Sequence, residues 1–116
     1  MKKLYIIKIG GNSIDDAVAL EKFLVNFSML EGLKVLIHGG GKTASELAKK
    51  LGVSQALVNG RRITDTETLK IATMVYAGLI NKQIVASLQS KKVNAIGLSG
   101  TDANMIQSTK RKAVDI

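Results

Sequence analysis

Two stretches of the 116-residue chain each run from a short apolar strand pattern through consecutive glycines into a helix pattern. In the first, Leu4 to Ile9 leads into Gly10-Gly11, and apolar residues then recur at helical spacing from Ala17 to Phe27. In the second, Lys34 to His38 leads into Gly39-Gly40-Gly41 and a further helix pattern. A helix between two strands returns the chain to the starting edge of a sheet, so the strands are parallel. The sequence therefore predicts an α/β fold, an open and mostly parallel sheet with helices on both faces.

Two helices are predicted to begin at capping boxes, in which a Ser or Thr is followed three residues later by an acidic residue. These pairs are Ser13 with Asp16 and Thr64 with Glu67. The second helix should run to about Ser90, with Gly78 packed closely against another backbone. Its core-facing stripe is expected to contain Leu69, Ala72, Tyr76, Leu79, Ile80, Gln83, Ser87 and Leu88.

The remaining segments read as turns and short strands. Asn59-Gly60, after the apolar stretch from Val53 to Val58, is a turn signal. Asn94 to Leu98 has the pattern of a third strand, and Ser99 to Asp102 that of the turn after it. Val114-Asp115-Ile116 resembles the start of another strand, so the chain is expected to stop within an element.

The net charge of +8, from 17 basic and 9 acidic residues, favours an anionic partner: nucleic acid, an acidic membrane or small acidic substrates. Two Tyr, two Phe and no Trp leave little aromatic surface for stacking on bases, which argues against nucleic acid. No apolar run reaches the roughly 20 residues that cross a bilayer, so neither membrane insertion nor export is expected. The absence of Cys fits a reducing cytoplasm.

The glycine turns are the first candidate for a binding site. Turns at the carboxyl ends of neighbouring parallel strands lie at the edge where open α/β sheets bind ligands. Glycine lacks Cβ, so backbone N–H groups of Gly10-Gly11 and Gly39-Gly40-Gly41 can approach a phosphate or carboxylate, and the helix after each turn favours the same charge. Neither turn matches a Walker loop or GxGxxG, and both can also be simple tight turns.

Basic side chains flank these turns. Lys8 lies two residues before the first turn, where it can neutralise charge on a transferring phosphoryl group or, alternatively, extend past the sheet edge into solvent. His38 is the only histidine and lacks an acidic partner, so a structural role is expected and no metal site is predicted. Arg61 or Arg62, before the long helix, can offer a two-pronged contact to a carboxylate.

Five motifs occur in the order found in the acetylglutamate kinases, and nearly the whole chain resembles this branch of the amino acid kinase family. They are Lys8-Ile9-Gly10-Gly11-Asn12, Ile37-His38-Gly39-Gly40-Gly41, Asn59-Gly60-Arg61-Arg62-Ile63-Thr64, Ala77-Gly78-Leu79-Ile80-Asn81-Lys82 and Gly97-Leu98-Ser99-Gly100-Thr101-Asp102-Ala103. The resemblance implies the amino acid kinase (carbamate kinase-like) fold. It also implies transfer of the ATP γ-phosphoryl group to the side-chain carboxylate of N-acetyl-L-glutamate or another N-acylglutamate, in arginine biosynthesis.

The resemblance also implies roles for individual residues. Lys8 would stabilise the moving phosphoryl group and, with Gly10 and Gly11, would contact ATP, which Mg²⁺ accompanies. Gly40 and Gly41 would hold the reacting carboxylate of the substrate, and Arg62 its α-carboxylate. The helix starting near Thr64 would form a homodimer contact.

The family pattern places residues 1–116 in the amino-terminal, substrate-binding domain of a longer enzyme, with the carboxyl-terminal, nucleotide-binding half absent. The truncated chain alone is then expected to be inactive, because phosphoryl transfer needs both reactants positioned together. Two alternatives stay open: a kinase acting on an aminoadipate derivative, and a non-catalytic module that binds acidic amino acids. The acyl group, acetyl or succinyl, is also open.

Overall fold

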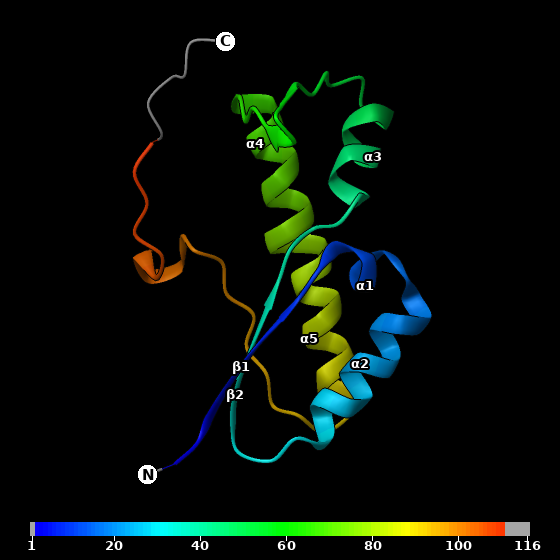
Figure 1. The fold of residues 1–116 in the computed structure, drawn as a ribbon, viewed down its shortest axis with the longest axis vertical. Coiled ribbons are helices and arrows are strands. Elements are labelled where there is room, and N and C mark those ends of the chain that lie inside the picture. The colour runs from blue at the N-terminus through cyan, green and yellow to red at the C-terminus, as the bar shows by residue number, and fades with distance from the viewer. Residues whose placement is uncertain (1, 111–116) are drawn as a thin grey trace.

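The computed structural model describes residues 2–110 (Figure 1). Its elements are β1 (Leu4–Ile9), α1 (Gly11–Asp15), α2 (Ala17–Met29), β2 (Leu33–His38), α3 (Thr43–Lys50), β3 (Leu57–Val58), β4 (Arg61–Arg62), α4 (Thr66–Ala72), the π-helix η1 (Thr73–Ile80), α5 (Asn81–Ser90) and the 3₁₀-helix η2 (Asp102–Asn104). Strands β1 and β2 pair in parallel, and β3 and β4 form an antiparallel hairpin. The predicted α/β class is confirmed. The predicted strand at Val114-Asp115-Ile116 lies outside the described residues.

The two faces of the β1–β2 sheet differ sharply in exposure. Strand residues alternate between faces, and Ile7, Ile9 and Leu36 pack into or against the core. On the opposite face, large apolar side chains are exposed: Leu4, Ile6, Leu33, Val35 and Ile37. Within residues 2–110 the helices therefore cover one face of the sheet, and the helical layer expected on the other face is not found in this part of the chain.

The segment predicted as a third strand, Asn94 to Leu98, is extended but is not a strand in the structure. Side chains of α5 bind its carbonyl oxygens instead: Gln89 Nε2 donates to Ala95 O (3.1 Å) and Lys82 Nζ to Gly97 O (2.9 Å). Exposed and partly buried residues still alternate along the segment, which is the signal that the sequence pattern detected. The predicted turn from Ser99 to Asp102 is confirmed by a hydrogen bond from Asp102 N to Ser99 O (3.1 Å).

Both predicted capping boxes are wrong, because aspartates cap the two helices. Oδ1 of Asp16 accepts hydrogen bonds from Val18 N and Ala19 N (2.9 and 3.0 Å), so α2 begins after Asp16, and Ser13 lies within the separate helix α1. Oδ1 of Asp65 accepts from Thr68 N (2.8 Å), and this backbone N–H lowers the pKa of Asp65. Helix α4 consequently begins at Thr66.

Helices α4, η1 and α5 form one continuous helical segment, but its buried stripe differs from the predicted one. The buried residues are Thr68, Ile71, Val75, Ile80, Asn81, Ile84 and Leu88. Leu69 and Leu79, predicted to face the core, are 56% and 47% exposed. The π-helix widens the turn, so the buried positions step by five residues from Val75 to Ile80. Gly78 is not closely packed, since an added Cβ would meet only Thr73 O at 3.9 Å.

The 25-residue helical segment Thr66–Ser90 is long and apolar enough, by length and composition, to cross a membrane. The expectation that no segment approaches this length and apolarity is therefore wrong. The core helix of a water-soluble protein meets the same two criteria, and about a third of the most apolar part of this segment is buried within residues 2–110. Length and composition alone thus carry little weight for membrane insertion.

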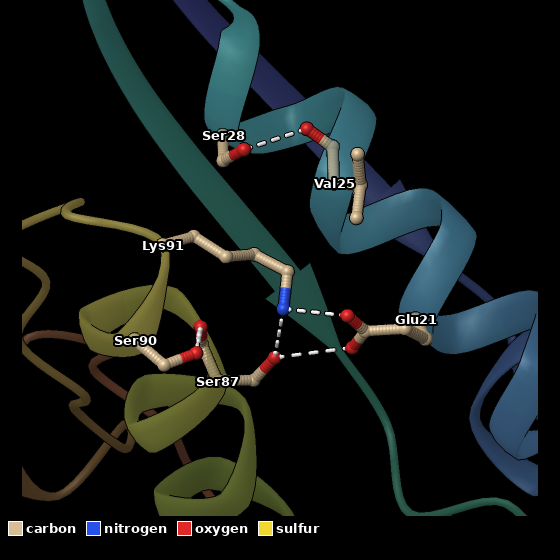
Figure 2. A network of polar contacts seen from close by, with 6 residues as sticks. All are labelled: Glu21, Val25, Ser28, Ser87, Ser90 and Lys91. Atoms are coloured by element: carbon tan, nitrogen blue, oxygen red, sulfur yellow. Dashed lines mark hydrogen bonds and ion pairs between the residues drawn. The ribbon is translucent and has the colours of Figure 1, made fainter.

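A polar network joins α2 to α5 beside the core (Figure 2). Lys91 Nζ lies 2.7 Å from Glu21 Oε1 and donates to Ser87 Oγ at 3.0 Å. Hydrogen bonding to Lys91 lowers the pKa of Glu21. The ionised Glu21 carboxylate therefore stabilises the fold at a pH above its unfolded-state pKa. This contribution is lost as the pH falls through its lowered folded-state pKa. The Glu21 carboxylate is exposed, so this ion pair between α2 and the end of α5 contributes little to stability.

Candidate functional site

The two glycine turns meet at one edge of the β1–β2 sheet. Gly10-Gly11 follows β1, Gly39-Gly40-Gly41 follows β2, and the strands run in parallel with Ile9 opposite His38. A Cβ added to Gly11 would lie 3.1 Å from Gly41 Cα, so the turns are in contact. The prediction that both turns lie at the same sheet edge is confirmed.

The glycines of the second turn have different structural causes. Gly41 has a φ of +55°, a conformation that L side chains rarely adopt. Gly40 is buried, and a Cβ there would overlap the ring of Tyr76. Gly39 has neither constraint, because an added Cβ would meet nothing within 4 Å. Packing and backbone conformation therefore account for two of the three glycines even without an anion.

These differences predict the effect of adding one methyl group at adjacent positions. Gly40→Ala should lower the free energy of unfolding by about 1–3 kcal/mol, because the Tyr76 ring has to move. Gly39→Ala, the matched control, should change it by less than about 0.5 kcal/mol. Urea denaturation of both variants measures the free energy of unfolding. An equal decrease in the two variants would show that Tyr76 does not pack against Gly40.

Asp15, which the sequence analysis did not single out, links the two turns. Both oxygens of its carboxylate share the N–H of Lys42 (2.9 and 3.2 Å), and the carboxylate occupies the space where a Cβ of Gly41 would lie. Among the hydrogen bonds formed outside helices and strands within residues 2–110, none uses the N–H of Gly40 or Gly41. The N–H groups of Gly40 and Gly41 are therefore not used by the backbone hydrogen bonds of these turns.

The β3–β4 hairpin places Arg62 beside this turn. Asn59 and Gly60 have φ values of +50° and +73°, as a two-residue hairpin turn of type I′ requires. Because β4 residues alternate between faces, Arg61 is exposed and Arg62 is partly buried. Arg62 Nη2 donates to Ser45 Oγ (2.6 Å) and Nη1 to Tyr76 Oη (3.2 Å). Sequence alone left the choice between the arginines to a family resemblance, and the hairpin supplies the physical reason.

Lys8 lies at the carboxyl end of β1, on the face of the sheet that the helices leave open. It is exposed, and its partner across the strand pair is Ile37. The Lys8 side chain forms no ion pair or hydrogen bond with the residues that the structure describes. Its ammonium group is therefore free to meet an anion or water, and the catalytic role of Lys8 stays a prediction.

His38 takes part in a structural hydrogen-bond chain. Its Nε2 lies 3.1 Å from Asn81 Nδ2, an amide donor, and its Nδ1 lies 2.9 Å from Gly39 O. Nε2 then accepts and Nδ1–H donates, which uses both ring nitrogens of a neutral imidazole. The geometry supports the structural role expected for His38. In residues 2–110, no group of three His, Asp or Glu residues is placed to hold a metal ion.

Comparison with known proteins identifies the relatives of the chain. The sequence pattern of the amino acid kinase family matches residues 3–116. An acetylglutamate kinase of Cytophaga hutchinsonii is 62% identical over 111 residues, which cover 96% of this chain and 42% of that protein. An acetylglutamate kinase of Phocaeicola vulgatus is 56% identical over 115 residues, which cover 99% of this chain and 45% of that protein. An acetylglutamate kinase of Methanopyrus kandleri is 38% identical over 109 residues, which cover 94% of this chain and 42% of that protein. The chain thus spans less than half the length of these relatives.

Proposed function

Because the chain belongs to the amino acid kinase family, we propose that the protein transfers the γ-phosphoryl group of ATP to the side-chain carboxylate of N-acetyl-L-glutamate. The names of its relatives support this activity, since proteins 38–62% identical to this chain are called acetylglutamate kinases. The observation that carries the proposal is the contact between Gly11 and Gly41, which joins two glycine turns at one sheet edge. A substrate carboxylate and a phosphoryl group can be held side by side there.

The proposed chemistry asks for positioning and charge from these residues. A side-chain carboxylate oxygen of the substrate attacks the γ-phosphorus, the bond to the β–γ bridging oxygen breaks, and an acyl phosphate and ADP form. Lys8 would neutralise charge on the phosphoryl oxygens, and Gly10 and Gly11 would approach the phosphates of ATP, which brings its own Mg²⁺. Gly40 and Gly41 would hold the reacting carboxylate through their N–H groups.

The other end of the substrate would meet Arg62. A guanidinium group binds a carboxylate through two parallel N–H bonds, and Arg62 is already held at the border of the second turn. The two carboxylates of an acylated glutamate would then lie on Gly40-Gly41 and on Arg62. We further propose a cytoplasmic location, which the absence of Cys fits.

Acyl phosphate formation tests this function. The protein expressed from its native gene should release ADP only when ATP and N-acetyl-L-glutamate are both present, and hydroxylamine should trap the product as a hydroxamate. N-succinyl-L-glutamate and N-acetyl-L-2-aminoadipate, run in parallel, compare the acyl group and the chain length. Binding of the substrate without ADP release would instead favour a non-catalytic module. The 116 residues expressed alone should show no appreciable turnover in the same assay.

We also propose a homodimer contact on the helical segment that begins at Thr66. A shallow apolar hollow on α4 and η1 is lined by Thr66, Leu69, Lys70, Thr73 and Met74, and Leu69 and Met74 are 56% and 51% exposed. Met74→Lys should shift the protein from dimer to monomer in size-exclusion chromatography with light scattering, because it places a charge in the contact. Val18→Lys is the matched control on α2, where Val18 is 79% exposed. A dimer that survives Met74→Lys unchanged would place the contact elsewhere.

A further inference from the structure

Tyr76 contacts both parts of the site that are proposed to bind the substrate, the Gly40-Gly41 turn and Arg62. It belongs to the π-helix η1, and its ring is partly buried and packs against the hydrophobic core. One edge of the ring fills the space where Gly40 would carry a Cβ, and its hydroxyl accepts a hydrogen bond from Arg62 Nη1 at 3.2 Å. A single rigid side chain therefore connects the second glycine turn to the arginine.

The hydrogen bonds of Arg62 leave the donors that a carboxylate needs. Arg62 Nη1 donates one hydrogen bond to the Tyr76 hydroxyl, and Nη2 donates one to the Ser45 hydroxyl at 2.6 Å. Each Nη atom carries two hydrogens, so one remains on each, which is the number that a bidentate contact uses. Nε is buried and has no partner among residues 2–110, so solvent does not reach that side of the guanidinium group.

The two anchors come from elements on either side of the second turn. Ser45 is in α3, which starts directly after the turn, and Tyr76 is in η1, whose tyrosine ring packs on Gly40. Fixing Arg62 to both elements fixes its separation from the N–H groups of Gly40 and Gly41. A long arginine side chain otherwise loses rotamer freedom on binding, and holding it in advance avoids part of that loss.

We propose that Tyr76 is a positioning residue: it holds Arg62 at a set distance from the Gly40-Gly41 turn, so that the site accepts a substrate whose two carboxylates are separated to match. This inference rests on the proposed function, because it takes Arg62 as the group that binds the α-carboxylate. Tyr76 acts through Arg62, whereas Ser45 supplies the second, exposed anchor.

Steady-state kinetics of the protein expressed from its native gene tests the proposal. Tyr76→Phe should raise the KM for N-acetyl-L-glutamate about 3- to 10-fold, since one hydrogen bond to a charged group is lost, and should change kcat less than about 2-fold. Tyr5→Phe is the matched control, because Tyr5 lies in β1, where it packs under Lys3. Ser45→Ala, at an exposed helix position that tolerates Ala, should raise the KM in the same direction.

A double substitution separates positioning from a general structural effect. In an Arg62→Ala background, Tyr76→Phe should leave kcat/KM unchanged, because the residue through which it acts is gone. An unchanged KM in both Tyr76→Phe and Ser45→Ala, or an equal loss with and without Arg62, overturns the positioning role alone, provided that the unsubstituted protein is active. If the unsubstituted protein forms no acyl phosphate from N-acetyl-L-glutamate, the proposed function fails and this inference with it.

Discussion

Lys8→Ala in the protein expressed from its native gene should lower kcat about 100- to 1,000-fold and change the KM for N-acetyl-L-glutamate less than about 3-fold. Negative charge shifts among the phosphoryl oxygens and the bridging oxygen during transfer, and a fixed ammonium group stabilises that state more than the bound reactants. Lys8 suits this task because it lies near the carboxyl end of β1, close to the joined glycine turns, and its side chain forms no ion pair within residues 2–110.

Two further variants show whether position or total charge matters. Lys2→Ala removes one positive charge from the same end of the chain, ahead of β1, and should leave kcat within about 2-fold of its original value. Lys8→Arg keeps the charge but changes its shape and reach, so it should recover only part of the activity. A high KM with normal kcat in Lys8→Ala would contradict the catalytic role and would make Lys8 a simple binding group.

The second large effect is expected at Arg62. Arg62→Ala should raise the KM for N-acetyl-L-glutamate about 10- to 100-fold, since the charge-assisted bonds to the α-carboxylate contribute about 1.5–3 kcal/mol. The variant should lower kcat much less than Lys8→Ala does, because this carboxylate does not change charge during the reaction.

Arg61 offers a matched control one residue away. It is exposed on the other side of β4, so Arg61→Ala removes the same charge without touching Ser45 or Tyr76 and should leave the KM within about 2-fold. Initial rates at varied N-acetyl-L-glutamate and saturating ATP compare the two variants. Equal KM changes would mean that the net charge, and not the held guanidinium group, attracts the substrate.

The sequence predicted the first two strand–glycine–helix units well because each is a local pattern. A run such as Leu4 to Ile9 followed by glycine determines its own strand and turn, and the helix between two strands makes them parallel. Helix starts were predicted less well, since neighbouring polar residues compete as caps: Asp16 and Asp65 cap their helices in place of Ser13 and Thr64.

Two other errors have a longer-range cause. The spacing of apolar residues cannot show that Thr73–Ile80 forms a π-helix, which shifts the buried stripe from Val75 to Ile80. An alternating pattern also cannot show whether a segment pairs with another strand. Residues Asn94 to Leu98 alternate in exposure, yet side chains of α5 donate hydrogen bonds to carbonyl oxygens of this segment. In both places the sequence shows which residues are apolar, but it does not show the backbone hydrogen bonds that determine the geometry.

Part of the candidate site follows from the sequence because its glycines and Lys8 cluster around the ends of two strands. Tyr76, Asp15 and Asn81 were missed as site residues, since each acts on a partner far away in the chain. Tyr76 had the pattern of an ordinary core position, and only the folded chain brings its ring to Gly40. The Asn81 signal was present in the Ala77–Lys82 motif, but its hydrogen bond to His38 requires the structure.

A crystal structure of the protein from its native gene, with N-acetyl-L-glutamate and a non-hydrolysable ATP analogue bound, tests the central claim most directly. We expect the side-chain carboxylate to accept hydrogen bonds from the N–H groups of Gly40 and Gly41, the α-carboxylate to contact Arg62, and Lys8 Nζ to lie against the γ-phosphate. An acylated glutamate bound away from the joined glycine turns, or a γ-phosphate out of reach of Lys8, would contradict it.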